Sequence, residues 1–256
     1  MKYILIIIIS FITYFTNIIC YNNIFFIKNN IFIKSKLCRL CYIKPIIRNN
    51  SKIFNIYNNY IYINELNNTK CIIFYNNTSI DICFKGTTNI ANVCSNIQIL
   101  FKSYNNIKVH NGFLNQYLIL KNKLFNNIDN IIKNNNISEI SLSGHSSGGA
   151  IANIASIDFC KKYNDIPIKC VTFGSPKVGN ENFVDEYNKY VKNSYRIVNK
   201  NDIIEYFPLP IIYKHIHQPI YLEENKNYKI YNNFLNVYQY IKHKHHIITY
   251  INNLIF

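Results

Sequence analysis

Residues 141–149, Ser-Leu-Ser-Gly-His-Ser-Ser-Gly-Gly, decide the fold because they place the pattern Gly-x-Ser-x-Gly between two different kinds of segment. Residues 137–143 are typical of a strand, and residues 150–163 carry apolar side chains at helical spacing. A strand, a sharp turn and a helix hold a serine hydroxyl exposed on the turn, where its neighbours have to be small. The pattern predicts a nucleophile elbow, with Ser146 as the nucleophile and the backbone N–H of Ser147 facing an oxyanion. The alternative is a Gly/Ser-rich loop without chemistry.

The segments on either side of the elbow alternate between strand and helix. Two strand-like runs, 71–75 and 80–84, enclose a short turn and predict a hairpin. The later segments are a helical pattern from 113 to about 133, strand-like runs at 168–173 and 194–198, and helical patterns at 180–192 and 234–241. This alternation predicts an α/β fold with a mostly parallel central sheet. Residues 21–65 have no clear pattern and are expected to pack at the N-terminal side.

The composition sets limits on domain number and partners. The chain has 256 residues, of which 49% are hydrophobic, enough for one sizeable core and a single domain. Its formal net charge of +15 comes from 28 basic and 13 acidic residues. This charge favours anionic lipid surfaces, but the lysines are scattered and the whole chain is rich in Ile, Asn, Lys and Tyr. We therefore expect no nucleic-acid partner.

The N-terminus has the pattern of a targeting segment. Lys2 precedes a short, mostly apolar stretch from Ile4 to Cys20, as in a secretory signal. Residues 1–20 are predicted to be a signal peptide or an uncleaved signal anchor, and residues 21–256 the folded domain. The expected location is the secretory pathway, either secreted or membrane-associated.

The eight cysteines suggest disulfides more than a metal site. With Cys20 in the leader, seven remain, so they cannot all pair within the chain. Cys38-x-x-Cys41 is a candidate for a short disulfide loop, and Cys71 and Cys83 flank the hairpin and are expected to lie close. No second C-x-x-C accompanies the first, so no metal is expected.

Five blocks, in the right order, resemble the class 3 (fungal-type) triacylglycerol lipases of the α/β-hydrolase fold. They are Ile82-Cys-Phe-Lys-Gly-Thr-Thr88, Val109-His-Asn-Gly-Phe113, the elbow Gly144–Gly149, Val171-Thr-Phe-Gly-Ser-Pro-Lys-Val-Gly-Asn180 and the segment Tyr195–Pro208. The resemblance extends from about Cys71 to Tyr250. It implies an α/β-hydrolase domain that needs no cofactor. Lys85 and Val93 depart from the family pattern, which usually has arginine and often tryptophan there, and Ser147 stands where leucine is common.

A serine nucleophile needs a base to take its proton and an acid to orient that base. The resemblance assigns the acid to Asp202, with Glu205 as the second candidate. The order Ser, Asp/Glu, His puts the base downstream. The candidates are His215, His217, His243, His245 and His246.

The choice among these histidines rests on family spacing. The family places its histidine a few residues before an aromatic residue, which favours His246 before Tyr250, with His245 as the alternative. His215, His145 and His110 are expected to be structural. The cluster of His243, His245 and His246 lacks the acids or cysteines that a metal site needs.

The resemblance also assigns the groups around the serine. Thr87 and Ser147 would supply oxyanion donors. Residues 88–99 would form a lid whose apolar face carries Ile90, Val93 and Ile97; the alternative is an ordinary surface helix.

These features together predict a monomeric serine hydrolase that cleaves acyl esters of lipids through an acyl-enzyme. It would meet its lipid ester substrate at a transient lipid or membrane interface. Two alternatives stay open: a soluble short-chain esterase or thioesterase, and a non-catalytic lipid-binding relative.

Overall fold

A computed structural model describes residues 29–43, 56–87, 100–208, 212–223 and 245–254. The predicted leader, the lid residues Ile90, Val93 and Ile97, the predicted helix at 234–241 and His243 lie outside these ranges. Within the described ranges no helix is long and apolar enough to cross a membrane.

The described chain is organised around one seven-stranded sheet in the order β1-β2-β3-β6-β7-β8-β9. The strands are β1 (Asn59–Glu65), β2 (Thr69–Tyr75), β3 (Ser79–Phe84), β6 (Glu139–His145), β7 (Ile168–Phe173), β8 (Asn193–Asn199) and β9 (Ile220–Leu222). β1, β2 and β3 pair antiparallel, and every pairing from β3 to β9 is parallel. The prediction of a mostly parallel sheet is confirmed, although β1 precedes the predicted hairpin β2–β3 and was not foreseen.

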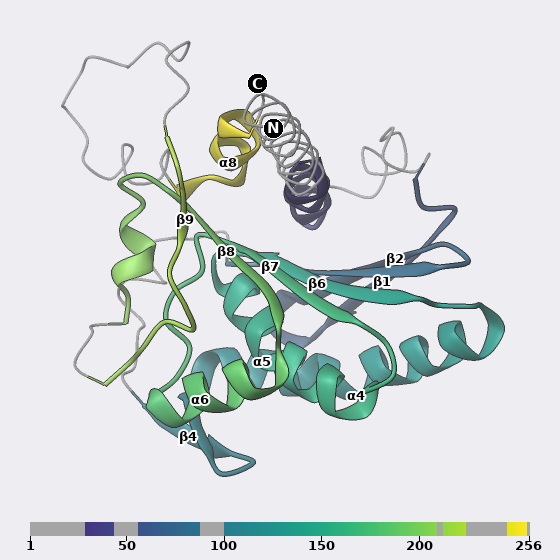
Figure 1. The fold of residues 1–256 in the computed structure, drawn as a ribbon, viewed down its shortest axis with the longest axis horizontal. Coiled ribbons are helices and arrows are strands. Elements are labelled where there is room, and N and C mark those ends of the chain that lie inside the picture. The colour runs from purple at the N-terminus through teal and green to yellow at the C-terminus, as the bar shows by residue number, and fades with distance from the viewer. Residues whose placement is uncertain (1–28, 44–55, 88–99, 209–211, 224–244, 255–256) are drawn as a thin grey trace, which may run out of the picture.

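Helices cover both faces of this sheet (Figure 1). On one face lie α4 (Asn111–Asn134), α5 (Ser147–Lys162) and α6 (Glu181–Tyr190). On the other lie the helical residues 29–40 and α8 (Ile247–Asn253). A short two-stranded ribbon, β4 (Phe101–Tyr104) with β5 (Ile107–His110), leads into α4. The result is a three-layer α/β architecture, as the alternating pattern predicts.

Each face of the sheet buries its own apolar cluster, because successive strand residues point to opposite sides. Ile73 and Ile82 pack with α4 and α5, whereas Ile72 and Phe74 pack with residues 29–40 and α8. The bounds of α4, α5, β7 and β8 agree within a few residues with those that the hydrophobic spacing predicts.

The same alternation corrects the two cysteine predictions. Cys71 is opposite Phe84 and Cys83 is opposite Ile72, so Cys71 and Cys83 face different sides of the sheet and are both free thiols. Cys38 is likewise a free thiol, buried under the sheet, so the predicted loop disulfide with Cys41 is absent from the described chain. The Cys-x-x-Cys spacing places Cys38 and Cys41 one turn apart at the end of a helix, where Cys41 Sγ lies 3.2 Å from the carbonyl oxygen of Cys83.

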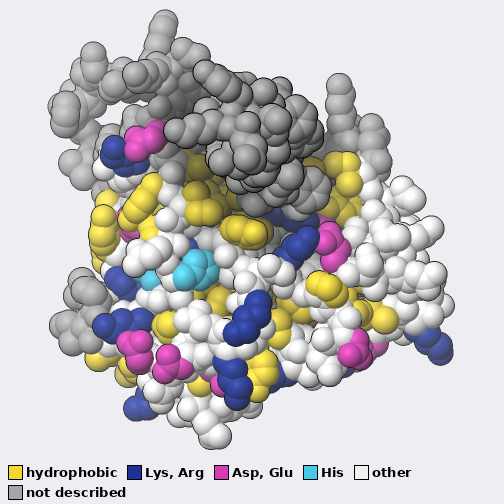
Figure 2. All heavy atoms as spheres, viewed as in Figure 1, with side chains coloured by type: hydrophobic (Ala, Val, Ile, Leu, Met, Phe, Trp, Pro, Cys, Tyr) yellow, Lys and Arg dark blue, Asp and Glu magenta, His cyan; other side chains and the backbone are white. Residues whose placement is uncertain are grey.

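The basic side chains are distributed over the visible face together with other kinds of side chain (Figure 2). On the face shown in Figure 2, Lys and Arg side chains are spread among uncharged and acidic ones. Several of them pair with carboxylates at the surface, such as Lys162 with Asp129 and Lys169 with Glu139.

Candidate active site

The elbow forms where β6 ends and α5 begins. Ser146 lies between them with φ 60° and ψ −133°, a conformation that a residue with a side chain rarely adopts. The backbone is held there by close packing. A Cβ on Gly144 would lie 2.2 Å from the carbonyl carbon of Gly148, and a Cβ on Gly148 would lie 2.3 Å from the carbonyl oxygen of Phe84. The two pattern glycines are therefore required, because the backbone of the elbow packs directly against itself at Gly144 and against Phe84 of β3 at Gly148, which leaves no room for a side chain.

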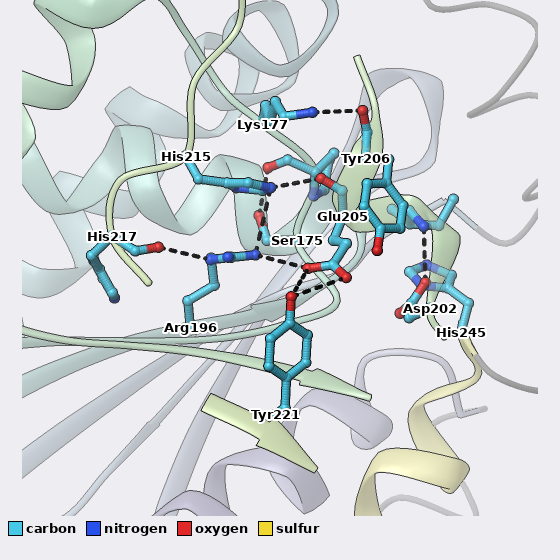
Figure 3. A network of polar contacts seen from close by, with 12 residues as sticks. Ser175, Lys177, Arg196, Asp202, Glu205, Tyr206, His215, His217, Tyr221 and His245 are labelled. Carbon is cyan, nitrogen blue, oxygen red and sulfur yellow. Dashed lines mark hydrogen bonds and ion pairs between the residues drawn. The ribbon is translucent and has the colours of Figure 1, made fainter. Parts of the chain in front are cut away.

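Asp202 follows β8 and is completely buried. Its Oδ1 accepts a hydrogen bond from the Ile204 N–H at 3.0 Å, and its Oδ2 accepts one from the Tyr250 hydroxyl at 2.6 Å. Oδ2 also lies 2.8 Å from Nδ1 of His245 (Figure 3). Burial and the charge of Asp202 raise the pKa of Tyr250 well above its ordinary value, so this hydroxyl keeps its proton and donates. The carboxylate is thus fixed in direction and aimed at one imidazole.

The imidazole on Asp202 belongs to His245, and the prediction that His246 occupies this position is wrong. His245 is 1% exposed, whereas His246 is exposed and caps α8 by accepting from the Ile248 N–H at 3.2 Å. The register of α8 is fixed because Ile247 and Tyr250 are buried against the sheet. With this register, His246 points to solvent. The number of residues between the histidine and Tyr250, on which the prediction was based, says nothing about this direction.

Two atoms at the centre of the site lack hydrogen bonds. Ser146 Oγ and His245 Nε2 are both buried, and neither has a hydrogen-bond partner among the described residues. Buried polar atoms without partners are rare and need an explanation. Eight such side-chain atoms occur in the described residues, and these two are the ones between which a proton would pass if a serine were activated by a histidine that a carboxylate orients.

The donors expected for an oxyanion lie beside the elbow. The Thr87 N–H donates to Ser147 Oγ at 2.8 Å, and Thr87 Oγ1 lies 3.1 Å from the same hydroxyl. Ser147 is the first residue of α5, so its own N–H is at the positive end of a helix of 16 residues. The structure thus brings Thr87 and Ser147 together, and in the described chain the acceptor on the Thr87 N–H is the Ser147 hydroxyl.

Gly174, which the sequence places directly after the strand-like run 168–173, lies against the candidate acid. Its φ is +54°, and a Cβ there would lie 2.6 Å from both Asp202 Oδ2 and the Tyr250 hydroxyl. The backbone at the end of β7 therefore forms the wall against which the carboxylate rests. In the sequence, the only sign of this role is a glycine directly after a buried strand, because the residues that it contacts, Asp202 and Tyr250, lie far along the chain.

Glu205, the second candidate for the acid, belongs to a neighbouring network (Figure 3). Its carboxylate lies 3.6 Å from the Arg196 guanidinium and accepts from the Tyr221 hydroxyl at 3.2 Å. His215 Nε2 lies 2.6 Å from the Glu205 carbonyl oxygen, and the His217 carbonyl accepts from Arg196. Burial lowers the pKa of His215 to about 3. None of these groups faces His245, so they hold the segment after Asp202 in place.

His110 has a structural position too. Its Nδ1 accepts from the Gly112 N–H at 3.2 Å and caps α4, and its ring stacks on Phe113. Burial lowers the pKa of His110 to about 4, which keeps Nδ1 free of a proton and able to accept. Among the described residues, no group of three His, Cys, Asp or Glu side chains is arranged to hold a metal ion.

The fold and the order of the elbow, acid and histidine along the chain define an α/β-hydrolase. The family model of class 3 lipases matches residues 82–211, about half of the chain, and the protein belongs to this family. The match contains the strand end with Thr87, the elbow and Asp202.

Two relatives resemble the chain in sequence, and a solved structure resembles it in fold. A secreted mono- and diacylglycerol lipase of Malassezia globosa is 33% identical over 137 residues, 51% of this chain and 44% of that protein. A Rhizomucor miehei lipase is 28% identical over 136 residues, 51% of this chain and 38% of that protein. The propeptide complex of a deletion mutant of Rhizomucor miehei lipase superimposes with a TM-score of 0.68 at 22% identity, covering 77% of this chain and 67% of that one. The matched segment spans less than half the length of these curated relatives.

Proposed function

We propose that this protein hydrolyses acyl esters of lipids through an acyl-enzyme. The supporting observation is the arrangement of three side chains: a strained Ser146 with a buried, unpartnered hydroxyl, a buried His245 with an unpartnered Nε2, and Asp202 2.8 Å from the other nitrogen of that histidine. The names of the relatives, which include mono- and diacylglycerol lipases, support a lipid ester as substrate.

In the proposed first step, His245 Nε2 takes the proton of Ser146 as Oγ attacks the ester carbonyl carbon. Asp202 holds Nδ1–H and stabilises the imidazolium that forms. The tetrahedral intermediate collapses when the imidazolium gives its proton to the leaving alcohol oxygen, and the acyl group stays on Oγ. Water then attacks the acyl-enzyme by the same proton path, which releases the fatty acid and restores the serine hydroxyl.

We assign the oxyanion to the backbone N–H groups of Thr87 and Ser147. The charge would develop at the N-terminus of α5, where the helix macrodipole lowers its energy. Because the Ser147 hydroxyl occupies the Thr87 N–H in the structure, the substrate oxygen has to replace it when the intermediate forms.

A soluble short-chain esterase or thioesterase is the second candidate, since the same three side chains serve any acyl transfer. The preference for lipid esters is expected to come from the proposed lid residues Ile90, Val93 and Ile97, which remain a prediction from the sequence. The N-terminal leader pattern and the word "secreted" in the names of relatives support entry into the secretory pathway.

The decisive experiment compares the purified protein with Ser146→Ala on a soluble short-chain ester and an emulsified long-chain acylglycerol. We expect both activities to fall on the order of 10³-fold or more, with an unchanged melting temperature, because only the nucleophile is removed. A fluorophosphonate should label the parent protein on Ser146 and leave the variant unlabelled. Equal turnover by the two proteins would reject the proposal, and activity restricted to the soluble ester would favour the esterase.

A further inference from the structure

Tyr42 comes from the N-terminal segment, outside the part of the chain that matches the family model, yet its hydroxyl reaches the proposed active site. The hydroxyl oxygen accepts from the Gly86 N–H at 3.0 Å and lies 3.1 Å from Nδ1 of His145. Gly86 is next to the proposed oxyanion residue Thr87, and His145 is next to Ser146. One tyrosine therefore contacts both the oxyanion loop and the elbow.

The ring of His145 extends this contact to the proposed base. Its Nε2 lies 2.5 Å from the carbonyl oxygen of His245, and the two imidazole rings are 4.6 Å apart between centroids. A carbonyl oxygen only accepts, so Nε2 of His145 must carry a hydrogen. Burial, together with the nearby His245, lowers the pKa of His145 well below its ordinary value, so the ring is neutral. Its Nδ1 then has a lone pair and needs a donor.

The Tyr42 hydroxyl is that donor. Burial raises the pKa of Tyr42 above its ordinary value, so the phenol keeps its proton. The phenol oxygen accepts from the Gly86 N–H, and the phenol hydrogen has two acceptors within reach on His145: Nδ1 at 3.1 Å and the carbonyl oxygen at 3.4 Å. The shorter contact assigns the hydrogen to Nδ1. The hydrogen bonds thus have one consistent direction: Gly86 N–H to Tyr42, Tyr42 O–H to His145, and His145 Nε2–H to the His245 carbonyl.

We propose that Tyr42 and His145 are positioning residues that hold the oxyanion loop, the nucleophile elbow and the base in one rigid arrangement. The inference rests on the proposed function of this site. The contacts leave little free space: a Cβ on Gly86 would lie 2.5 Å from the Tyr42 hydroxyl and 2.3 Å from the His145 carbonyl oxygen. Neither residue transfers a proton to or from substrate in this arrangement.

Loss of the Tyr42 hydroxyl would leave His145 Nδ1 and the Gly86 N–H without their partner and would loosen both catalytic loops together. Small displacements of reacting groups lower the rate of the chemical step, by about a hundredfold for a displacement near 1 Å. Tyr42→Phe should therefore lower kcat by roughly ten- to hundredfold on a soluble ester, with KM within about twofold of its original value.

Tyr57→Phe is the matched control. Tyr57 is another buried N-terminal tyrosine, and its hydroxyl donates to Asp81 in β3, where Lys34 also binds. This variant should lower the melting temperature and leave kcat within about twofold. A purely structural role for Tyr42 would give the same pattern as Tyr57 and would overturn the inference.

A double-mutant cycle with His145→Gln tests whether the two residues act as one chain. We expect the double variant to lose no more kcat than the more damaged single variant, because either change breaks the same path. Losses that multiply would show independent roles and would overturn the inference.

The failure of this inference can be told from the failure of the proposed function. A parent protein that neither hydrolyses esters nor takes a fluorophosphonate would reject the function. An active parent with an unimpaired Tyr42→Phe variant would reject only the positioning role. Nitrogen NMR of His145, assigned by its absence in His145→Gln, provides a readout without substrate. We expect a hydrogen on Nε2, and a shift of the Nδ1 signal in Tyr42→Phe; a hydrogen on Nδ1, or no shift, would overturn the inference.

Discussion

The identity of the base offers a sharp test, because two adjacent histidines have opposite environments. His245 is buried on Asp202, and His246 is an exposed helix cap. His245→Gln keeps a side chain of similar length with an amide N–H for Asp202, but it cannot accept a proton from Ser146. His246→Ala removes the cap and leaves the contact between His245 and Asp202 in place.

The two variants should affect different quantities: His245→Gln the catalytic rate, and His246→Ala the stability. Serine, histidine and acid act as a unit, so loss of the base should lower kcat on the order of 10⁴-fold, equivalent to about 5 kcal/mol of transition-state stabilisation. Loss of the His246 cap should cost about 1 kcal/mol of stability, because its Nδ1 satisfies one N–H at the start of α8. For a domain of this size that corresponds to a fall in melting temperature of about 2–4 °C.

The assay is steady-state hydrolysis of a soluble chromogenic ester, paired with thermal unfolding of each variant. We expect His245→Gln to be folded and almost inactive, and His246→Ala to be active and slightly less stable. The reasoning is refuted if His246→Ala is the inactive variant while still folded, or if His245→Gln keeps kcat within tenfold.

Three further predictions concern the surroundings of the site. Asp202→Asn should lower kcat by about 10³- to 10⁴-fold, because its carboxylate orients the imidazole. Glu205→Gln should mainly lower the melting temperature, because the Glu205 carboxylate pairs with Arg196 and faces away from the imidazole. The reverse pattern in kinetics and melting would show that Glu205 is the acid. Folding lowers the pKa of His110 from 6.5 to about 4, so between these pH values the unfolded chain binds a proton that the folded chain does not, and stability drops as the pH falls from about 6.5 towards 4. His110→Asn keeps an acceptor for the cap and should make the melting temperature fall less steeply over this range. An unchanged pH profile would exclude this contribution. Ser147→Ala should raise kcat by about two- to tenfold, because it frees the Thr87 N–H for the substrate oxygen, whereas a decrease would show that the hydroxyl donates to the oxyanion.

Features that depend on neighbours in the chain were predictable from the sequence. The Gly-x-Ser-x-Gly turn, the hairpin after Cys71 and the strand before Gly174 follow from local spacing, since strand and helix periodicities are properties of short segments. The position of Asp202 directly after β8 follows from a motif within one segment. The need for Gly144 was predictable in the same way, because its close contacts are with Gly148 and Gly149, whereas Gly148 packs against Phe84, which only the folded sheet brings next to it.

The N-terminal helix was not predictable in the same way. Its residues 29–40 mix Lys, Ser and Cys with apolar residues, and both Lys34 and Ser35 are buried. The helix is stable in this place because Lys34 meets Asp81 from β3, a partner that only the folded sheet supplies. Polar burial of this kind hides the apolar stripe on which a sequence-based prediction depends.

The sequence by itself determined the α/β fold, and it supplied the candidate nucleophile Ser146 from a local pattern and the candidate acid Asp202 from the family resemblance. Tertiary structure alone decided between His245 and His246, since the burial of Tyr250 and Ile247 sets the register of α8. It also decided that Cys71 and Cys83 face opposite sides of the sheet, and that Tyr42 lies on the elbow. These outcomes depend on the direction of a side chain relative to a distant segment, and a change of one residue in register reverses that direction while the local pattern stays almost the same.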